Sequence, residues 1–309
     1  MLLALILCMS LSSCFTGIEG TKKITLSRDD VKKAAPTPEE KFLADIIAAP
    51  ASDWLPGRQF AVVSPRVVSI LSPLGNAPQA DMLAGDTILF VNSSLSQGID
   101  GVSRPSLLFR HGDDTYIYTD RRSEASSLST LTSDKIPMLV DLEMVRQAEE
   151  RLRGRRFFLR SLDWQSADGS HLRGEKFIPV TITDVSVGDL AFPVRVAFRA
   201  DDGRSGFFPM SLGGSGSRDF SKLFFLSDPH KKYPDISDEM WQHIRRGETV
   251  AGMTKLECRL AIGDPSEVNP GRDYNYTYDL WQYPDGTTLF FRDGILSGSK
   301  IPSGPFEPD

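Results

Sequence analysis

The chain has 309 residues, 40% of them hydrophobic and 25% charged, and its formal net charge is −6 at pH 7. This composition is typical of a globular protein with enough apolar surface for two or three packed domains. The acidic balance argues against nucleic acid as a partner, because phosphate backbones bind to basic surfaces.

The chain begins with an apolar segment over residues 1–11 that predicts an export signal. Crossing a bilayer takes about 20 apolar residues, so this segment is too short for a transmembrane helix but has the length of a signal-peptide core. For this segment, an ordinary cleaved signal and a buried N-terminal helix stay open as interpretations.

Leu11-Ser12-Ser13-Cys14 follows this segment: an aliphatic residue, two small residues and a cysteine. The pattern resembles the lipobox of bacterial lipoproteins. The resemblance implies a signal peptide at 1–13, acylation of the Cys14 thiol, anchoring in membrane lipid and a tether at 14–36. Two or more acyl chains anchor a protein stably, whereas one gives marginal binding. We therefore expect a lipid-anchored protein of the cell envelope, at the outer membrane.

The third cysteine, Cys258, has no partner once Cys8 is removed with the leader and Cys14 is acylated, so no disulfide is expected. Cys258 lies in a helix-like run. There a buried packing role is favoured over a nucleophile.

A helix is predicted over residues 38–49, at the start of a first β-rich module at 37–122. Thr37 and Glu40 have the spacing of a capping box, with Pro38 in the first turn. The apolar positions share one side of the helix: Phe42, Leu43, Ile46 and Ile47.

Three short patterns recur along the chain and indicate an internal repeat. Residues 55–60 match 152–157 as Leu-x-Gly-Arg-x-Phe, 83–88 match 172–177 as Leu-x-Gly-x-x-apolar, and 108–110 match 197–199 around Phe-Arg. Each copy follows a predicted helix, the second at 138–152. The second module is therefore placed at 134–226.

Apolar and polar residues alternate within each copy, which indicates half-buried strands. Asp201-Asp202-Gly203 predicts a hairpin turn, and Asp113-Asp114 has the same place in the first copy. For Asp113-Asp114, a cation site with His111 is the alternative, but a turn is favoured. Short strands joined by glycine-containing turns predict a compact barrel, and we expect an SH3-like barrel in each module.

Two features of the second module each have a structural and a functional interpretation. Residues 211–217 are rich in Gly and Ser and are interpreted as a linker, with an anion site as the alternative. The basic cluster is interpreted as a solvated helix end, with an anionic ligand as the alternative: Arg151, Arg153, Arg155 and Arg156.

A third, smaller module is predicted at 235–300. One helix spans 235–247, and a second begins at the capping box of Thr254 and Glu257 and ends at residues 263–265. Strands at 274–283 and 287–291 are joined by the turn at 284–286, and a third short strand at 294–299 extends the sheet. The expected fold class is α+β: two SH3-like barrel modules, each preceded by a helix, then two helices with a small antiparallel sheet.

The motifs of this module are similar to those of the small outer-membrane assembly lipoproteins of the BamE, or SmpA, family. The matching motifs are Gly-Met-Thr-Lys at 252–255, Gly-Asp-Pro at 263–265, Trp-Gln-Tyr at 281–283 and Phe-Phe-Arg-Asp-Gly at 290–294. The resemblance implies two helices packed on a short antiparallel sheet. It also implies a binding role toward other envelope proteins and no catalytic role.

Tyr274, Tyr276 and Tyr278 alternate along the first strand of this module and therefore share one of its faces. If that face is exposed, these tyrosines and Trp281 are the residues we expect to bind a partner. Core packing is the favoured interpretation for the aromatic residues of the strands themselves: Trp281, Tyr283, Phe290 and Phe291.

The sequence has neither a nucleophile elbow nor the His and Cys spacing of a metal site, so no catalytic residue, metal or cofactor is assigned. The expected function is a non-enzymatic, lipid-anchored binding or assembly factor whose partner is an envelope protein. Two alternatives stay open. One is peptidoglycan or glycan binding through the tandem β modules, and the other is an envelope hydrolase.

Overall fold

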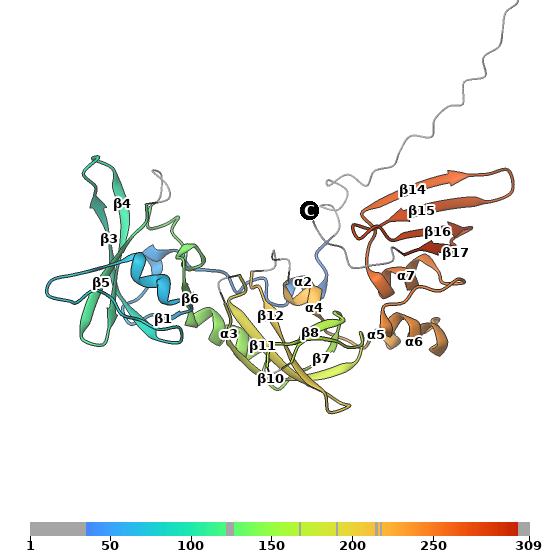
Figure 1. Ribbon diagram of the computed structural model, residues 1–309, viewed down its shortest axis with the longest axis horizontal. Coiled ribbons are helices and arrows are strands. Elements are labelled where there is room, and N and C mark those ends of the chain that lie inside the picture. Colours follow the sequence, from blue (N-terminus) through green and yellow to red (C-terminus); the bar gives the residue numbers. More distant parts are fainter. Residues whose placement is uncertain are drawn as a thin grey trace, which may run out of the picture. The chain divides into compact units, whose positions relative to one another are not determined.

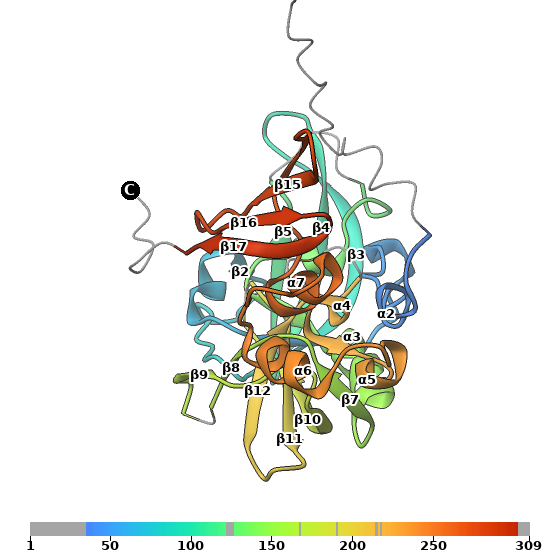
Figure 2. The ribbon, with the colours of Figure 1, turned by 90° about the vertical axis from the view of Figure 1, so that its right-hand side faces the viewer.

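The computed structural model describes residues 35–301 apart from 122–126, 167, 190, 214, 215 and 217. Contacts within the chain define two compact units: residues 35–249 with 260–262, and residues 250–259 with 263–301. The described part is mixed α+β with three antiparallel sheets, which confirms the expected fold class at this level (Figure 1, Figure 2). The predicted signal peptide and Cys14 lie outside the described residues.

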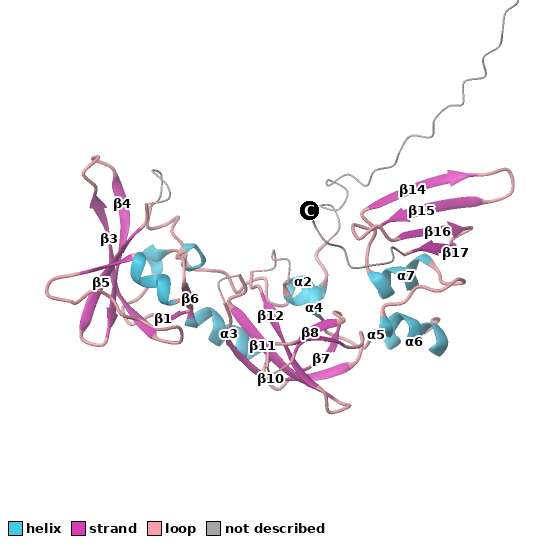
Figure 3. Ribbon diagram, in the orientation of Figure 1, coloured by secondary structure: helices cyan, strands magenta, loops and turns pink. Residues whose placement is uncertain are grey.

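The first sheet has six strands in the order β2-β5-β4-β3-β1-β6, and neighbours are antiparallel (Figure 3). The strands are β1 (Gln59–Val62), β2 (Leu71–Pro73), β3 (Thr87–Gln97), β4 (Ser103–His111), β5 (Asp114–Thr119) and β6 (Leu139–Asp141). Three 3-10 turns accompany them: η1 (Ala51–Asp53), η2 (Pro65–Ser69) and η3 (Ser133–Lys135). The turn predicted at Asp113-Asp114 is confirmed, because β4 and β5 form a hairpin around Gly112, whose φ is 59°.

Aromatic side chains on the inner face of this sheet form the centre of the first core. Trp54, Phe60, Phe90 and Phe109 are buried. Their ring centroids lie between 4.9 and 6.2 Å apart in four contacting pairs, most of them edge-to-face. Such pairs add about 0.5–1.5 kcal/mol each beyond the burial of their area. The alternation seen in the sequence therefore builds a core on one side of the sheet.

The second sheet has seven strands in the order β13-β7-β10-β11-β12-β8-β9. They are β7 (Arg156–Leu159), β8 (Asp163–Gln165), β9 (His171–Arg173), β10 (Pro179–Val187), β11 (Val194–Ala200), β12 (Ser205–Met210) and β13 (Phe224–Phe225). Helix α3 (Leu142–Leu152) precedes the sheet and packs on β10. The hairpin predicted at Asp201-Asp202-Gly203 is confirmed between β11 and β12, with a φ of 90° at Gly203.

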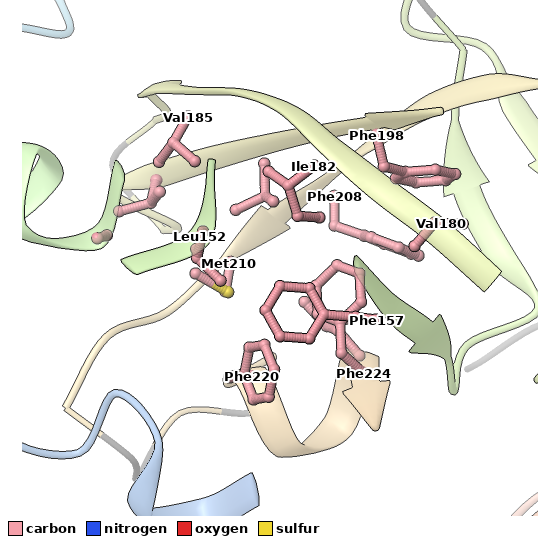
Figure 4. Packing of buried hydrophobic residues seen from close by; sticks show 14 of the residues in the cluster. Leu152, Phe157, Val180, Ile182, Val185, Phe198, Phe208, Met210, Phe220 and Phe224 are labelled. Carbon is pink, nitrogen blue, oxygen red and sulfur yellow. The ribbon is translucent and has the colours of Figure 1, made fainter. Parts of the chain in front are cut away.

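Side chains from several elements meet in the second core (Figure 4). The ring of Phe157 in β7 lies 5.1 Å from that of Phe220 and 5.8 Å from that of Phe224. Leu152 of α3 and Met210 of β12 are fully buried beside them. The end of α3 is thus part of the core and helps to cover the sheet.

The two β sheets have the same strand order. When each order starts at the last strand in the chain that joins the main part of the sheet, the first sheet is β6-β1-β3-β4-β5-β2 and the second is β13-β7-β10-β11-β12-β8. The second sheet has β9 in addition, next to β8. Each has a bulge at the same place, directly after Phe90 in β3 and after Ile182 in β10. In each module, a glycine just before the first strand bonds to the residue that precedes the bulge. Gly57 N–H donates to Phe90 O (2.7 Å), and Gly154 N–H donates to Ile182 O (2.9 Å).

One of the three matches predicted between the copies is wrong. Gly85 N–H donates to Val62 O (2.8 Å), and the equivalent bond in the second module runs from Phe177 N–H to Leu159 O (2.6 Å). Gly85 therefore corresponds to Phe177 and not to Gly174. Both residues have a positive φ, 102° and 59° respectively. A phenylalanine keeps this left-handed conformation because its ring is buried against two other aromatic rings.

The segment that precedes the first module packs on the second. The predicted helix over 38–49 is limited to α2 (Pro38–Lys41), which has the expected capping box. Phe42, Leu43 and Ile46 follow it and belong to the second core. Such a short helix has little stability of its own, so the burial of these side chains decides the path of the chain.

The segment that precedes the second module belongs to the sheet of the first module. The helix predicted from residue 138 begins only at Leu142, because β6 (Leu139–Asp141) pairs with β1 and completes the first sheet. The predicted module boundaries, 37–122 and 134–226, are therefore wrong at both N-terminal ends, since each module contains a segment of the other.

Three further helices belong to the same unit: α4 (Phe220–Leu223) lies between β12 and β13, and α5 (Pro229–Lys232) and α6 (Asp238–Arg246) follow the second sheet. Helix α6 ends at Gly247 (φ 67°), as predicted. Its Trp241 packs against Phe177, with 5.6 Å between ring centroids. The predicted module at 235–300 is therefore divided, because α6 belongs to the unit of the β modules.

The other unit contains most of α7 (Lys255–Ile262) and a sheet in the order β14-β15-β16-β17. The strands are β14 (Glu267–Arg272), β15 (Thr277–Gln282), β16 (Thr288–Arg292) and β17 (Ile295–Lys300). The capping box of Thr254 and Glu257 is confirmed, and so is the turn at 284–286 between β15 and β16. β14 was not predicted, because Pro270 and Gly271 are typical of a turn.

Candidate binding surfaces

Residues on the two faces of the C-terminal sheet have different surroundings. Trp281, Leu289 and Phe291 are buried on the face that α7 covers, where the Arg259 guanidinium lies 4.8 Å from the centre of the Trp281 ring. The opposite face carries half-buried Tyr276, Tyr278, Leu280 and Phe290. We call these four residues the tyrosine face.

A glycine fixes the position of Tyr278 on this face. Gly271 lies opposite Tyr278 in the neighbouring strand β14, and a Cβ at position 271 would lie 2.1 Å from the Cζ of Tyr278. Only glycine therefore allows the ring to lie across β14. The ring also stacks on Phe290, with 5.8 Å between centroids and 29° between planes. Tyr278 is thus a rigid aromatic group, a type that is frequent at protein interfaces.

Charged groups border the tyrosine face. The Arg292 guanidinium lies 4.3 Å from the centre of the Tyr276 ring. A hydrogen bond to Asp273 raises the pKa of the Tyr276 hydroxyl. The face therefore has an apolar centre with polar groups at one margin, which is how the parts of a protein interface are arranged.

The structure corrects one predicted partner-binding residue and locates another. Trp281 is 1% exposed on the α7 side of the sheet, so the core-packing interpretation applies and Trp281 is not available to a partner. Tyr274 is fully exposed in the turn between β14 and β15. The two-residue alternation from Tyr278 leads to Leu280 and not to Trp281, and this signal was present in the sequence.

A second surface lies between the two β modules, within the first unit. It is a groove of about 530 Å³, which we call the seam groove. Four separate stretches of chain line it, with residues 46–48 from the first, 132–134, 136–141, 144 and 145 from the second, 189, 191, 193 and 194 from the third, and 211–213 from the fourth. Most of the described lining side chains are apolar, and two exposed carboxylates, Asp134 and Asp189, belong to the lining.

Strand β6 is the part of the groove wall that joins the two modules. Successive side chains of a strand point to opposite faces. Leu139 accordingly packs in the first core and Val140 in the second. Met138, just before β6, has a φ of 64°, and its carbonyl accepts a hydrogen bond from Val63 N–H (3.0 Å). Left-handed φ in a residue with a side chain is strained and occurs most often where a site requires a particular backbone path.

The last residue of β6, Asp141, is held by three hydrogen bonds. Its Oδ2 accepts from Arg58 Nη2 (2.6 Å) and Nε (3.1 Å), and its Oδ1 accepts from Glu143 N–H (3.1 Å) at the start of α3. Asp141 is 3% exposed. One carboxylate therefore caps a helix of the second module and pairs with an arginine beside β1 of the first.

Acidic or aromatic neighbours surround each arginine of the predicted basic cluster. Arg151 pairs with Asp45, Arg153 with Glu149 (2.6 Å) and Arg156 with Asp201 (2.5 Å), while Arg155 lies 4.9 Å from the centre of the Phe42 ring. These contacts favour a structural role over an anionic-ligand site.

Among the residues that the structure describes, no three or more His, Cys, Asp and Glu side chains are arranged to hold a metal ion. No helix of the same residues has the length and apolar character needed to cross a bilayer.

Half-buried Lys176 and buried Cys258 have strongly shifted pKa values. Burial, with a smaller effect of the nearby Arg160 guanidinium, lowers the pKa of Lys176 to about 8. Its Nζ donates to the carbonyls of Ala261 (2.5 Å) and Leu260 (3.3 Å) at the end of α7. Burial, with a smaller effect of Glu257, raises the pKa of the Cys258 thiol to about 12. Cys258 thus has the environment expected of a packing residue.

Comparison of the chain with protein-family models, curated proteins and solved structures gives no match. Sequence reasoning located the tyrosine face but missed the seam groove. The groove is formed by four stretches of chain that are distant in sequence, and no local pattern in any of them indicates it.

Proposed function

We propose that this protein is a lipid-anchored lipoprotein of the cell envelope, exported by residues 1–13 and acylated at Cys14. It acts as a non-enzymatic binding or assembly factor for another envelope protein at the outer membrane. The acyl chains hold the folded units at the membrane surface, and the tether at 14–36 gives them reach.

The tyrosine face is the observation that carries the binding role. It presents Tyr278, Leu280 and Phe290 on a sheet face that α7 leaves open, with a charged margin at Arg292. Aromatic residues and arginine are enriched in protein interfaces and contribute most of the binding energy there. The fixed orientation of Tyr278 lowers the entropy that binding costs.

The remaining parts of the proposal concern the modules. We propose that the two β modules are copies of one SH3-like unit, which their common strand order and common bulge support. The resemblance of the C-terminal module to the BamE family is supported by the capped helix α7 on an antiparallel sheet. The chain departs from the expectation at α6, which groups with the β modules.

Site-specific photocrosslinking in intact cells tests the binding role. A photoreactive phenylalanine derivative at Tyr278 is expected to form an adduct with a specific envelope protein. The matched control is Leu83, which is 66% exposed on the first β module and lies outside both surfaces. No protein adduct from position 278, or the same adducts from both positions, contradicts the proposal. Adducts to cell-wall glycan would support the glycan-binding alternative instead.

A further inference from the structure

The outer edge of β6 is open to another strand. β6 is the last strand of the first sheet, and no strand of the described residues pairs with its other side. The bond from Val63 N–H to Met138 O, with the pairing of Ala61 and Val140, sets the alternation of hydrogen bonds between β1 and β6. In an antiparallel pair the intervening residues direct their backbone groups away from the partner strand. Leu139 therefore directs its N–H and C=O outward.

The seam groove supplies an apolar bed next to this edge. Leu139, Val140 and Asp141 line the groove together with the start of β11 and the residues after β12. Its volume of about 530 Å³ lies within the usual range of ligand pockets. Ile47, also in the lining, is 66% exposed, which is high for isoleucine. The groove therefore combines a free backbone edge with exposed apolar surface.

The charged side chains that line the groove determine which charge a ligand should carry. Asp134 and Asp189 are exposed, and the described lining residues include no lysine or arginine. Asp141 already has Arg58 as its counter-ion. A cationic ligand is therefore favoured, and an anionic one, such as a fatty acid or the phosphate of a lipid headgroup, is repelled.

We propose that the seam groove binds an extended peptide segment that has alternating apolar side chains and at least one lysine or arginine. The segment adds a strand to the edge of β6, so that Leu139 N–H and C=O bond to its backbone. Its apolar side chains contact Ile47 and the groove floor, and its cation pairs with Asp134. Backbone bonds give affinity in this binding mode, and side-chain contacts give specificity. This site is separate from the tyrosine face and does not depend on it.

Selection from a random dodecapeptide library on the purified full-length protein tests the proposal. Peptides with alternating apolar residues and a lysine or arginine should be enriched. Ile47→Asp should weaken the binding of the selected peptides by at least about tenfold, the equivalent of 1.4 kcal/mol. Leu83→Asp is the matched control, because Leu83 has the same exposed fraction as Ile47, and it should leave the affinity unchanged.

Charge and backbone are tested on the same peptides. Asp134→Lys should weaken binding by about fivefold, and Asp113→Lys, on an exposed hairpin of the same module, should not. Amide hydrogen exchange at Leu139 should slow when the peptide is bound. Tyr278→Ser should leave peptide affinity unchanged, which keeps this test independent of the tyrosine face.

Three results would overturn the proposal. They are equal losses for Ile47→Asp and Leu83→Asp, enrichment of acidic peptides, and unchanged exchange at Leu139 under saturating peptide. Displacement of the selected peptides by oleate in Asp134→Lys but not in the native protein would support it, because it would show that the acidic margin excludes anionic ligands.

Discussion

Replacement of Asp141 by alanine should strongly destabilise the first unit. The change removes two hydrogen bonds to Arg58 and the cap of α3. Breaking a buried ion pair by removing one partner costs about 3–5 kcal/mol, since the other charge is left unpaired. Arg58 retains 17% of its side-chain exposure, so water partly solvates it. We therefore expect a loss near the lower limit, about 3 kcal/mol, of which about 1 kcal/mol comes from the helix cap.

Urea unfolding of the purified chain, followed by tryptophan fluorescence, measures this loss. Asp141→Asn serves as the control variant, because asparagine caps helices as well as aspartate does but removes the charge. It should lose about 1 kcal/mol less than Asp141→Ala. A loss below about 1 kcal/mol for Asp141→Ala would refute the reasoning, because it would show that the pair contributes little beyond an exposed salt bridge.

Three further predictions concern single residues of the described chain. Lys176 releases its proton near pH 8 in the folded state and near 10.5 when unfolded, so the unfolded chain binds more protons between these values. The free energy of unfolding should therefore rise with pH in that range by at most about 3 kcal/mol. The reference is a Lys176→Met variant, measured in parallel urea titrations. A difference in stability between the two proteins that does not change with pH would contradict the burial of a charged amine. Met138→Gly should be about 1 kcal/mol more stable than Met138→Ala in the same assay, because glycine accepts the φ of 64° without strain and alanine does not. Equal stabilities of the two variants would argue against backbone strain at position 138. Cys258 should resist iodoacetamide at pH 8 in the folded protein and react once urea unfolds it, as peptide mapping would show; rapid labelling of the folded chain would be inconsistent with its burial.

Local sequence signals predicted the parts of the fold that local chemistry determines. Thr254 with Glu257, and Gly247 at the end of α6, fix helix ends through hydrogen bonds within a few residues. The hairpin at residues 284–286 is determined in the same way. β14 was missed because Pro270 and Gly271 are typical of a turn, although an edge strand such as β14 tolerates a proline.

The parts that were mispredicted depend on contacts between distant segments. Ile46 follows a capped helix start, yet its burial in the second core ends the helix after a single turn. The side chains of Leu139 and Val140 point to opposite faces, as in any strand. That one packs in the first core and the other in the second is a property of the assembled modules. The seam groove arises from that division and could not be predicted from either segment alone.

The candidate binding residues show the same distinction. Tyr276 and Tyr278 were placed on one face by alternation, and the structure puts their rings 6.4 Å apart on one side of the sheet. Trp281 was named with these tyrosines as a partner-binding residue, with core packing as the favoured interpretation, and its odd spacing from Tyr278 places it on the opposite, buried face. Periodicity was therefore a better guide than residue type.

The proposed role at the membrane depends on the acylation of Cys14, and mass spectrometry of the mature N-terminus tests it most directly. The account predicts a chain that begins at Cys14 and carries the mass of a diacylglyceryl group on its thiol, with the added mass absent from Cys14→Ser. A mature chain with an unmodified N-terminal residue, or a Cys14→Ser form that still partitions fully into detergent, would contradict the account.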